Sequence, residues 1–212
     1  TVARGLGTLV RIGGEDYIMT HNHWSIAARE MAHVTLRAAD GEQLLTLDAA
    51  PFRALLRYQG PGIMILAAPT DLENVTFASL GDDTGLVSGN VVWLASQGAG
   101  GDDAIGVSSA HVQKIEALET TTLLHLDGAS TATVAGDSGA GIWHDGKLVG
   151  VLWAITEAPT PRSWWQWLNQ TRKWQPTGQV VAIMQPLGGP SGLRASDLAS
   201  DAQRYSTDEH GP

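Results

Sequence analysis

The sequence predicts an all-β protein made of two groups of short strands. Short segments with alternating or β-branched apolar side chains recur along most of the chain, and glycine, Asp-Gly and proline positions separate them. Residues 71–89 carry few strand signals and divide these segments into two sets of about six. Regular short strands of this kind build barrels and sandwiches. We therefore expect a first barrel in residues 1–70, a linker in residues 71–89 and a second barrel in residues 90–190.

The strand signals are clear enough to assign ranges. In the first set we expect strands over residues 7–12, 16–20, 33–38, 43–47, 52–58 and 63–68. In the second set we expect strands over residues 90–95, 104–115, 121–126, 141–143, 147–153 and 179–186. Gly13-Gly14, Asp40-Gly41 and Asp145-Gly146 supply turn signals between neighbouring strands.

Two segments have helical rather than strand character. Residues 25–32 form a short helical pattern, and residues 163–174 lie in a tryptophan-rich insert that spans 158–176. Read as a helix, the insert places Trp164, Trp167 and Trp174 roughly on one face. Such a face serves either as a lid packed on the barrel or as a binding surface for a protein partner. The polar tail of residues 191–212 predicts at most one helical turn, near residues 195–202.

Composition excludes several classes of function. The formal net charge of -9 would repel a phosphate backbone, so nucleic acid is not an expected partner. The chain has no cysteine, which excludes disulfides, thiolate metal sites and cysteine catalysis. The apolar runs are too short to span a bilayer, and no histidine or carboxylate spacing indicates a metal site. We expect neither a cofactor nor an integral membrane segment.

Residues 136–141, with the sequence Gly-Asp-Ser-Gly-Ala-Gly, carry the strongest chemical signal. A serine hydroxyl is a poor nucleophile unless it is exposed and paired with a base. The glycines that flank Ser138 permit a tight turn in which backbone N–H groups face one point, where an oxyanion is stabilised. An ordinary glycine-rich loop between strands is the alternative interpretation of this segment.

The second signal is a pair of histidines at the end of a predicted strand. His21 and His23 lie in the segment Thr20-His21-Asn22-His23, between that strand and a short helical pattern. A neutral imidazole on a rigid element can act as a general base near pH 7. A surface histidine pair, or a His-x-His metal site without an evident third ligand, are the alternatives.

Together, these segments resemble those of the chymotrypsin-like (trypsin-like) serine peptidases, nearer the bacterial high-temperature-requirement and glutamyl endopeptidase relatives. Residues 20–23 are similar to the family's Thr-Ala-Ala-His or Thr-Asn-Asn-His, and residues 136–140 to its Gly-Asp-Ser-Gly-Gly, with Ala140 replacing the last glycine. The resemblance covers about residues 5–155. It implies two six-stranded antiparallel β-barrels of chymotrypsin type with the active site between them, a protein or peptide substrate, and slightly favours an extracytoplasmic location.

The resemblance assigns roles residue by residue. Ser138 would attack the carbonyl carbon, His23 would take the serine proton, and the N–H groups of Gly136 and Ser138 would form the oxyanion hole. The substrate pocket would be formed by Ala132, Thr133, Leu152, Trp153, Ala154 and Ile155. These residues carry no charge, so the resemblance favours a small or medium apolar side chain at the cleaved bond.

The third member of the triad departs from the family pattern. Gly62 stands where the family has an aspartate before its last first-barrel strand. Three alternatives remain: Asp48 orients His23 if the chain bends at Pro51, Asp71 does so, or the enzyme works as a Ser-His dyad. We take Asp48 as the tentative third catalytic residue.

Two other functional classes compete with an endopeptidase. One is a catalytically silent member of the fold that binds a protein partner, which the glycine at position 62 favours. The other is a hydrolase of esters or small acyl groups. Its Gly-x-Ser-x-Gly spacing is broken by Ala140, and its alternating helices are absent from the sequence pattern.

Overall fold

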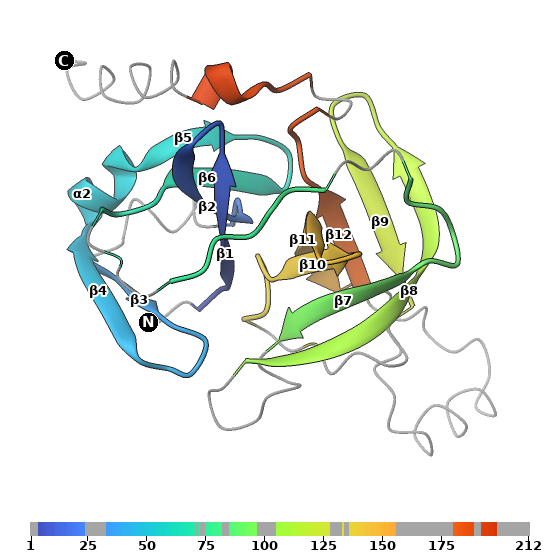
Figure 1. The fold of residues 1–212 in the computed structure, drawn as a ribbon, viewed down its shortest axis with the longest axis horizontal. Coiled ribbons are helices and arrows are strands. Elements are labelled where there is room, and N and C mark those ends of the chain that lie inside the picture. The colour runs from blue at the N-terminus through green and yellow to red at the C-terminus, as the bar shows by residue number, and fades with distance from the viewer. Residues whose placement is uncertain are drawn as a thin grey trace, which may run out of the picture.

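A computed structural model describes residues 4–23, 33–70, 72, 75–81, 85–96, 105–127, 133, 136–155, 180–188 and 192–198. Within these ranges the chain forms twelve strands, six before and six after the segment that the sequence marks as a linker. Figure 1 shows the two groups of strands side by side, with the linker running between them. The predicted domain boundaries themselves stay predictions.

The first group of strands forms an open sheet and a separate hairpin. The sheet has the antiparallel order β1-β2-β6-β5 and consists of β1 (Gly7–Ile12), β2 (Glu15–His21), β6 (Ile63–Ala67) and β5 (Leu56–Gln59). The hairpin pairs β3 (His33–Arg37) with β4 (Gln43–Asp48). Val34, Leu36 and Leu47 of the hairpin pack against a cluster that includes Ile18 and Met64. The predicted six-stranded first barrel is therefore not confirmed, because side-chain packing rather than strand pairing joins the hairpin to the sheet.

The strand predicted over residues 52–58 is wrong in its first half. The chain forms the short helix α2 (Ala49–Ala54) there, and β5 begins only at Leu56. Asp48 at the N-cap has extended backbone, with φ -66° and ψ 163°. Pro51 lies in the first turn, where its missing N–H leaves no helical hydrogen bond unmade. Phe52 is the buried residue of the helix.

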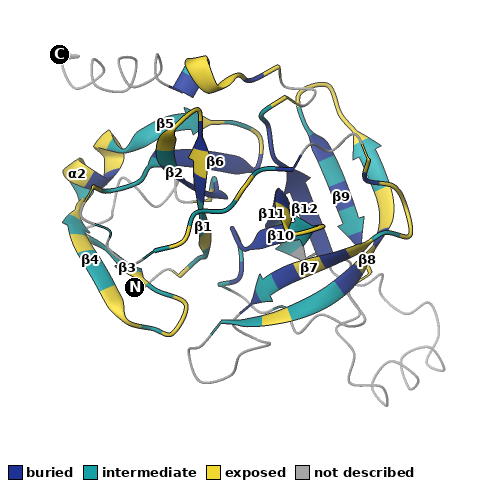
Figure 2. Ribbon diagram, viewed as in Figure 1, coloured by how far each residue is buried: buried dark blue, intermediate teal, exposed yellow. Residues whose placement is uncertain are grey.

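The second group of strands forms a closed six-stranded barrel, as the sequence predicts. Its order is β10-β11-β12-β9-β8-β7, and β7 pairs with β10 to complete the closure. The strands are β7 (Val91–Ser96), β8 (Gly106–Ala117), β9 (Thr122–Leu126), β10 (Gly141–His144), β11 (Lys147–Ile155) and β12 (Val180–Met184). Figure 2 shows β12 in dark blue, in agreement with the burial of all five of its residues. The predicted tryptophan-rich insert of residues 158–176 lies outside the described residues.

The linker and the start of the tail join the two groups of strands. Ala78 forms a parallel bridge with Val10 of β1, and Leu80 forms one with Leu148 of β11. The buried side chain of Gln185 donates from Nε2 to the carbonyl oxygen of Gly81 at 2.9 Å. Residues 195–198 form the predicted helical turn, and Leu198 is fully buried in the cluster that also contains Val10.

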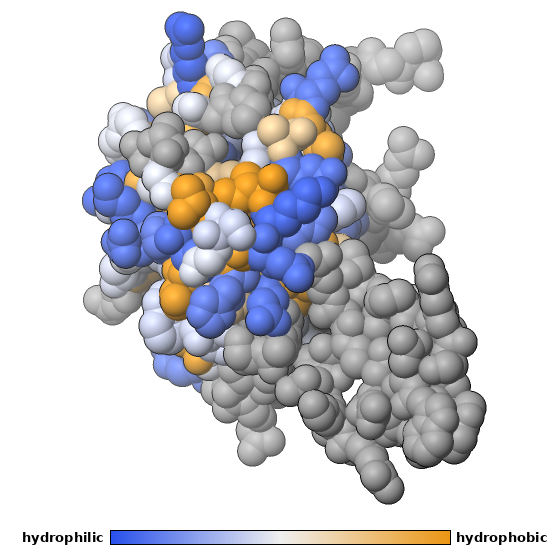
Figure 3. All heavy atoms as spheres, turned by 90° about the vertical axis from the view of Figure 1, so that its right-hand side faces the viewer, coloured by the Kyte–Doolittle hydropathy of each residue, from blue (hydrophilic) through white to orange (hydrophobic). Residues whose placement is uncertain are grey.

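Among the described residues on the side that Figure 3 shows, no large continuous apolar face is visible. Apolar residues lie there in small groups among hydrophilic ones. The exposed large apolar side chains of the described residues are Val87, Val91, Trp93, Val107 and Leu118. No helix in the described part of the chain is long and apolar enough to cross a membrane.

Candidate active site

A tight turn presents Ser138 at the edge of the second barrel. The N–H of Ala140 donates to the carbonyl oxygen of Asp137 at 2.9 Å and closes a four-residue turn with Ser138 as its second residue. Gly139 has φ 90°, as the third position of a type II turn requires. The N–H of Gly139 also donates to the carbonyl oxygen of Leu152 at 2.7 Å. Residues 137–140, which we name the nucleophile turn after the role that the sequence predicts for Ser138, are thus fixed to β11 by their backbone.

Gly139 also brings this turn against the first group of strands. A Cβ atom at position 139 would overlap the carbonyl oxygen of Leu6 and would lie 2.5 Å from Oγ1 of Thr20 and 3.0 Å from Cδ2 of His21. The N–H of Leu6 donates to the carbonyl oxygen of Ser138 at 2.8 Å. The hydroxyl of Thr20 donates to the carbonyl oxygen of Leu6 at 2.5 Å. The Ser138 turn therefore packs directly on the end of β2, which carries His21.

The histidine turn, residues 21–23, continues from the end of β2. His21 is buried and His23 is exposed. Nδ1 of His21 accepts a hydrogen bond from the backbone N–H of His23 at 3.1 Å, a bond of the kind an asparagine makes in an Asx-turn. The two rings meet edge to face, with centroids 4.6 Å apart and planes at 66°. Nδ2 of Asn22 donates to the carbonyl oxygen of Gly60 at 3.0 Å and ties this turn to the loop before β6.

The environment of His21 keeps its ring neutral. Burial, and to a lesser extent the neighbouring His23, lower the pKa of His21 to about 4. At pH 7 the ring is therefore uncharged, and its Nδ1 lone pair is available to accept the His23 N–H. The sequence interpretation gave His21 no chemical role, although its spacing of two residues from His23 is the signal that places both in one turn.

The position where the resemblance implies an aspartate is closed to a side chain. Gly62 has φ 77°, in the left-handed region. A Cβ atom there would lie 2.6 Å and 2.8 Å from Cγ1 and Cδ1 of Ile183, and 3.2 Å from Cδ1 of Trp153. The ring of Trp153 lies in turn 6.4 Å from the ring of His23, centroid to centroid. Apolar side chains from β11 and β12 thus occupy the space in which the family's carboxylate is expected.

Asp48 lies at the outer edge of the first group of strands. It is exposed, ends β4 and stands opposite His33 in the register of the hairpin. Figure 1 shows β4 and α2 on the side of the molecule remote from the second barrel. This placement gives Asp48 no advantage over the other two alternatives, and its catalytic role stays a prediction. Asp71 lies outside the described residues.

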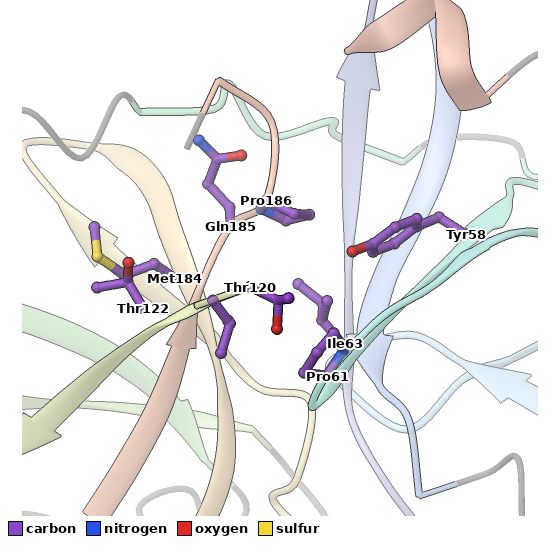
Figure 4. A pocket seen from close by; sticks show the side chains of 9 residues that line it. Tyr58, Pro61, Ile63, Thr120, Thr122, Met184, Gln185 and Pro186 are labelled. Atoms are coloured by element: carbon purple, nitrogen blue, oxygen red, sulfur yellow. The ribbon is translucent and has the colours of Figure 1, made fainter. Parts of the chain in front are cut away.

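A small cavity beside Gly62 contains no acidic group. Its volume is about 10 Å³, close to that of one water-sized sphere. Figure 4 shows Tyr58, Pro61 and Ile63 on one side of it and Thr122 and Met184 on the other. The full lining is Tyr58, Pro61, Ile63, residues 120–122 and residues 184–186. None of these side chains is a carboxylate, so this cavity offers no third triad residue behind Gly62.

The residues expected to form the substrate pocket differ in exposure. Leu152 is buried in the barrel core, whereas Thr133, Trp153 and Ala154 are half-buried. Ile155 ends β11, and Ala132 lies outside the described residues. Gly136, with φ 109°, directly precedes the buried Asp137 and the Ser138 turn. The pocket and oxyanion-hole roles of these residues stay predictions.

Among the described residues, no group of three or more histidine, aspartate or glutamate side chains is arranged to hold a metal ion. Among the described ionisable residues, His21 lies against the residue that follows Ser138, and the buried Asp137 precedes it in the chain. The described residues thus place the Ser138 turn against the end of β2, next to the histidine turn, at the junction of the two groups of strands.

Solved structures that resemble this chain show which fold it has. No family model matches the sequence, and no curated protein matches it. Among solved structures, the HtrA-type protease AlgW with a decapeptide matches 93% of this chain and 50% of its own, with 16% identity and a TM-score of 0.57. An inactive form of Rv3671c from M. tuberculosis, in which a serine is replaced by alanine, matches 98% of this chain and 84% of its own, with 14% identity and a TM-score of 0.51.

A third structure, Deg5, matches 71% of this chain and 73% of its own, with 16% identity and a TM-score of 0.51. The chain spans about half the length of the HtrA-type structures that it matches. At these identities the likeness concerns the fold. The chain therefore has the chymotrypsin-like fold of the HtrA-type and Deg serine proteases, as its sequence motifs indicate.

Proposed function

We propose that this chain of chymotrypsin-like fold is a serine endopeptidase that cleaves peptide bonds through an acyl-enzyme. Ser138 Oγ attacks the scissile carbonyl carbon while His23 takes the hydroxyl proton and later gives it to the leaving amine. The backbone N–H groups of Gly136 and Ser138 stabilise the oxyanion. Water then attacks the acyl-enzyme, with His23 again acting as base, and releases the second product.

The close packing of the Ser138 turn on the histidine turn carries this proposal. Gly139, the residue after the nucleophile, lies against the ring of His21, and His21 holds the backbone of His23. This packing supports a shared role for Ser138 and the exposed imidazole of His23 at the junction of the two groups of strands. A chance glycine-rich loop has no reason to lie against the ring of His21 and to accept a hydrogen bond from the N–H of Leu6.

A peptide substrate is the second part of the proposal. The AlgW structures that match this fold hold a decapeptide or a tripeptide. The uncharged residues Thr133, Trp153 and Ala154 favour a small or medium apolar side chain at the cleaved bond. A protein partner at the tryptophan-rich insert stays a prediction, because that insert lies outside the described residues.

A catalytically silent binding module is the competing function, and the closed position at Gly62 favours it. The two functions differ in whether Ser138 is activated. A fluorophosphonate modifies only an activated serine, so its reaction with the native chain, followed by mass spectrometry, separates them. We expect modification at Ser138 and cleavage of a peptide library, both lost in Ser138→Ala and His23→Ala.

The matched control for His23→Ala is His111→Ala, since His111 is also exposed but lies on β8. We expect it to react at the rate of the native chain. A folded native chain that resists the fluorophosphonate and leaves the library intact would contradict the endopeptidase and support the silent module. Modification without peptide cleavage would instead support a hydrolase of small acyl groups.

A further inference from the structure

The imidazole of His23 has aromatic neighbours in the region where an orienting carboxylate is expected. The ring of His21 meets it edge to face at 4.6 Å, and the ring of Trp153 lies at 6.4 Å with a tilt of 48°. Trp153 also lies against Gly62, so the same side chain is near both that residue and the ring of His23. The two rings come from β2 and β11, which belong to different groups of strands.

We propose that His21 and Trp153 are positioning residues that orient His23 by packing, in the region where the family has a triad carboxylate and where the described residues place none. This inference rests on the proposed function of His23 as the general base. His21 fixes the backbone of His23 through the hydrogen bond to Nδ1 and limits the ring on one side. Trp153 limits the ring on another side and, with Ile183, excludes a side chain at position 62.

Aromatic packing around His23 would affect catalysis differently from a hydrogen-bonded carboxylate. A carboxylate both orients the imidazole and stabilises the imidazolium that forms during acyl transfer. Aromatic neighbours restrict the rotation of the ring, and the face of an indole attracts a cation more weakly than an ion pair does. His21 is neutral at pH 7, so it adds no charge that would repel the imidazolium. The inferred enzyme therefore keeps the benefit of orientation and forgoes most of the electrostatic benefit.

Two alternatives among the described residues are weaker. Asp48 is exposed at the end of β4, opposite His33. The cavity beside Gly62 is lined by threonine, tyrosine, glutamine and apolar side chains. Within the part of the chain that the structure describes, neither feature brings a carboxylate to His23.

The first test measures the maximal rate at which saturating fluorophosphonate modifies Ser138. We expect Trp153→Ala to lower this rate about 100-fold, the usual effect of a misplaced catalytic group, and Trp153→Phe to restore most of it. Trp93→Ala is the matched control, because Trp93 is half-exposed on β7 and lies outside the site; we expect the native rate.

The same assay separates the hydrogen bond of His21 from its bulk. We expect His21→Asn to keep most of the rate, because the asparagine carbonyl accepts the His23 N–H in the same turn. We expect His21→Leu, which fills the space without an acceptor, to lower the rate about tenfold. Equal losses in both variants would contradict the proposed role of Nδ1.

The second test does not depend on activity. The ring protons of His23 should show ring-current shifts in the NMR spectrum of the unreacted protein, and Trp153→Ala should remove them while Trp93→Ala leaves them. Unchanged His23 signals in Trp153→Ala would overturn the inference. So would an Asp48→Ala rate that falls by about 10⁴, the effect of losing a working triad carboxylate. If Ser138 itself never reacts, the proposed function fails, and the NMR comparison still decides whether the packing is present.

Discussion

The nucleophile turn and the histidine turn are held in place by different kinds of contact. Backbone hydrogen bonds fix residues 137–140, and the positive φ and close approaches of Gly139 allow no other residue there. Side chains fix residues 21–23, through Nδ1 of His21 and the amide of Asn22. The Ser138 turn is therefore fixed by backbone atoms and by a glycine pattern that is visible in the sequence, whereas the proposed orientation of His23 depends on a side chain distant in sequence, Trp153.

This difference predicts where substitutions act. Changes in the nucleophile turn should damage stability and reactivity together, because its backbone also joins the two groups of strands through Leu6. Changes around the histidine turn should lower the reactivity of Ser138 more than they lower stability, because a packed ring can be replaced without breaking strand pairing.

The largest effect is expected for Gly139→Ala. The added methyl group would overlap the carbonyl oxygen of Leu6 and would require φ 90° of an alanine. Left-handed strain and backbone overlap together should lower the free energy of unfolding by about 4 kcal/mol. Denaturant unfolding measures this loss, and fluorophosphonate modification of Ser138 should disappear with it.

Gly146→Ala separates the two causes of that loss. Gly146 has a similar positive φ of 74°, but an added Cβ meets no atom within 4 Å. It should cost only the conformational strain, about 1 kcal/mol. Equal destabilisation of the two variants would show that the close approach of the Ser138 turn to Leu6 does not exist in solution.

The next largest effect is expected for Gly62→Asp, which restores the family's aspartate. Overlap with Ile183 and the φ of 77° should destabilise the fold by about 3 kcal/mol. The reaction of Ser138 should not become faster, because the carboxylate has no room to reach His23. Gly41→Asp is the control, since Gly41 has φ 89° in open space. A folded Gly62→Asp protein that reacts faster than the native chain would contradict the closed third position.

The same contrast explains what the sequence could and could not predict. The strands and the Ser138 and His23 motifs depend on local patterns, and so their positions could be read directly. The helix at residues 49–54 was missed because Pro51 and the alternating apolar residues after it resemble a bent strand. The packing of Trp153 on Gly62 joins residues about 90 positions apart, and no local pattern records such a contact.

A smaller effect is expected from the protonation of His21. Its pKa is about 4 in the folded chain and about 6.5 when unfolded. Below pH 6.5 the unfolded chain therefore binds a proton that the folded chain does not, and stability falls as the pH falls toward 4. After allowance for solvent screening, we expect a loss of about 1–2 kcal/mol. Denaturant unfolding at pH 7 and pH 4.5 measures it, and His21→Asn should show a smaller decrease. An equal decrease in both proteins would place the titrating group elsewhere.

The smallest effect is expected for Thr20→Val, which removes the hydroxyl that binds the carbonyl oxygen of Leu6. The shape of the side chain is kept, so the loss should be that of one buried hydrogen bond, about 1 kcal/mol by denaturant unfolding. Thr46→Val is the control, because the hydroxyls of Thr46 and Thr35 meet on the exposed hairpin and should contribute little. If Thr20→Val also slowed the modification of Ser138 while Thr46→Val did not, the position of the nucleophile turn would depend on a side chain of β2. The backbone contacts at Gly139 would then not be enough to hold the Ser138 turn in place. Both turns would depend on side-chain contacts, the histidine turn more strongly.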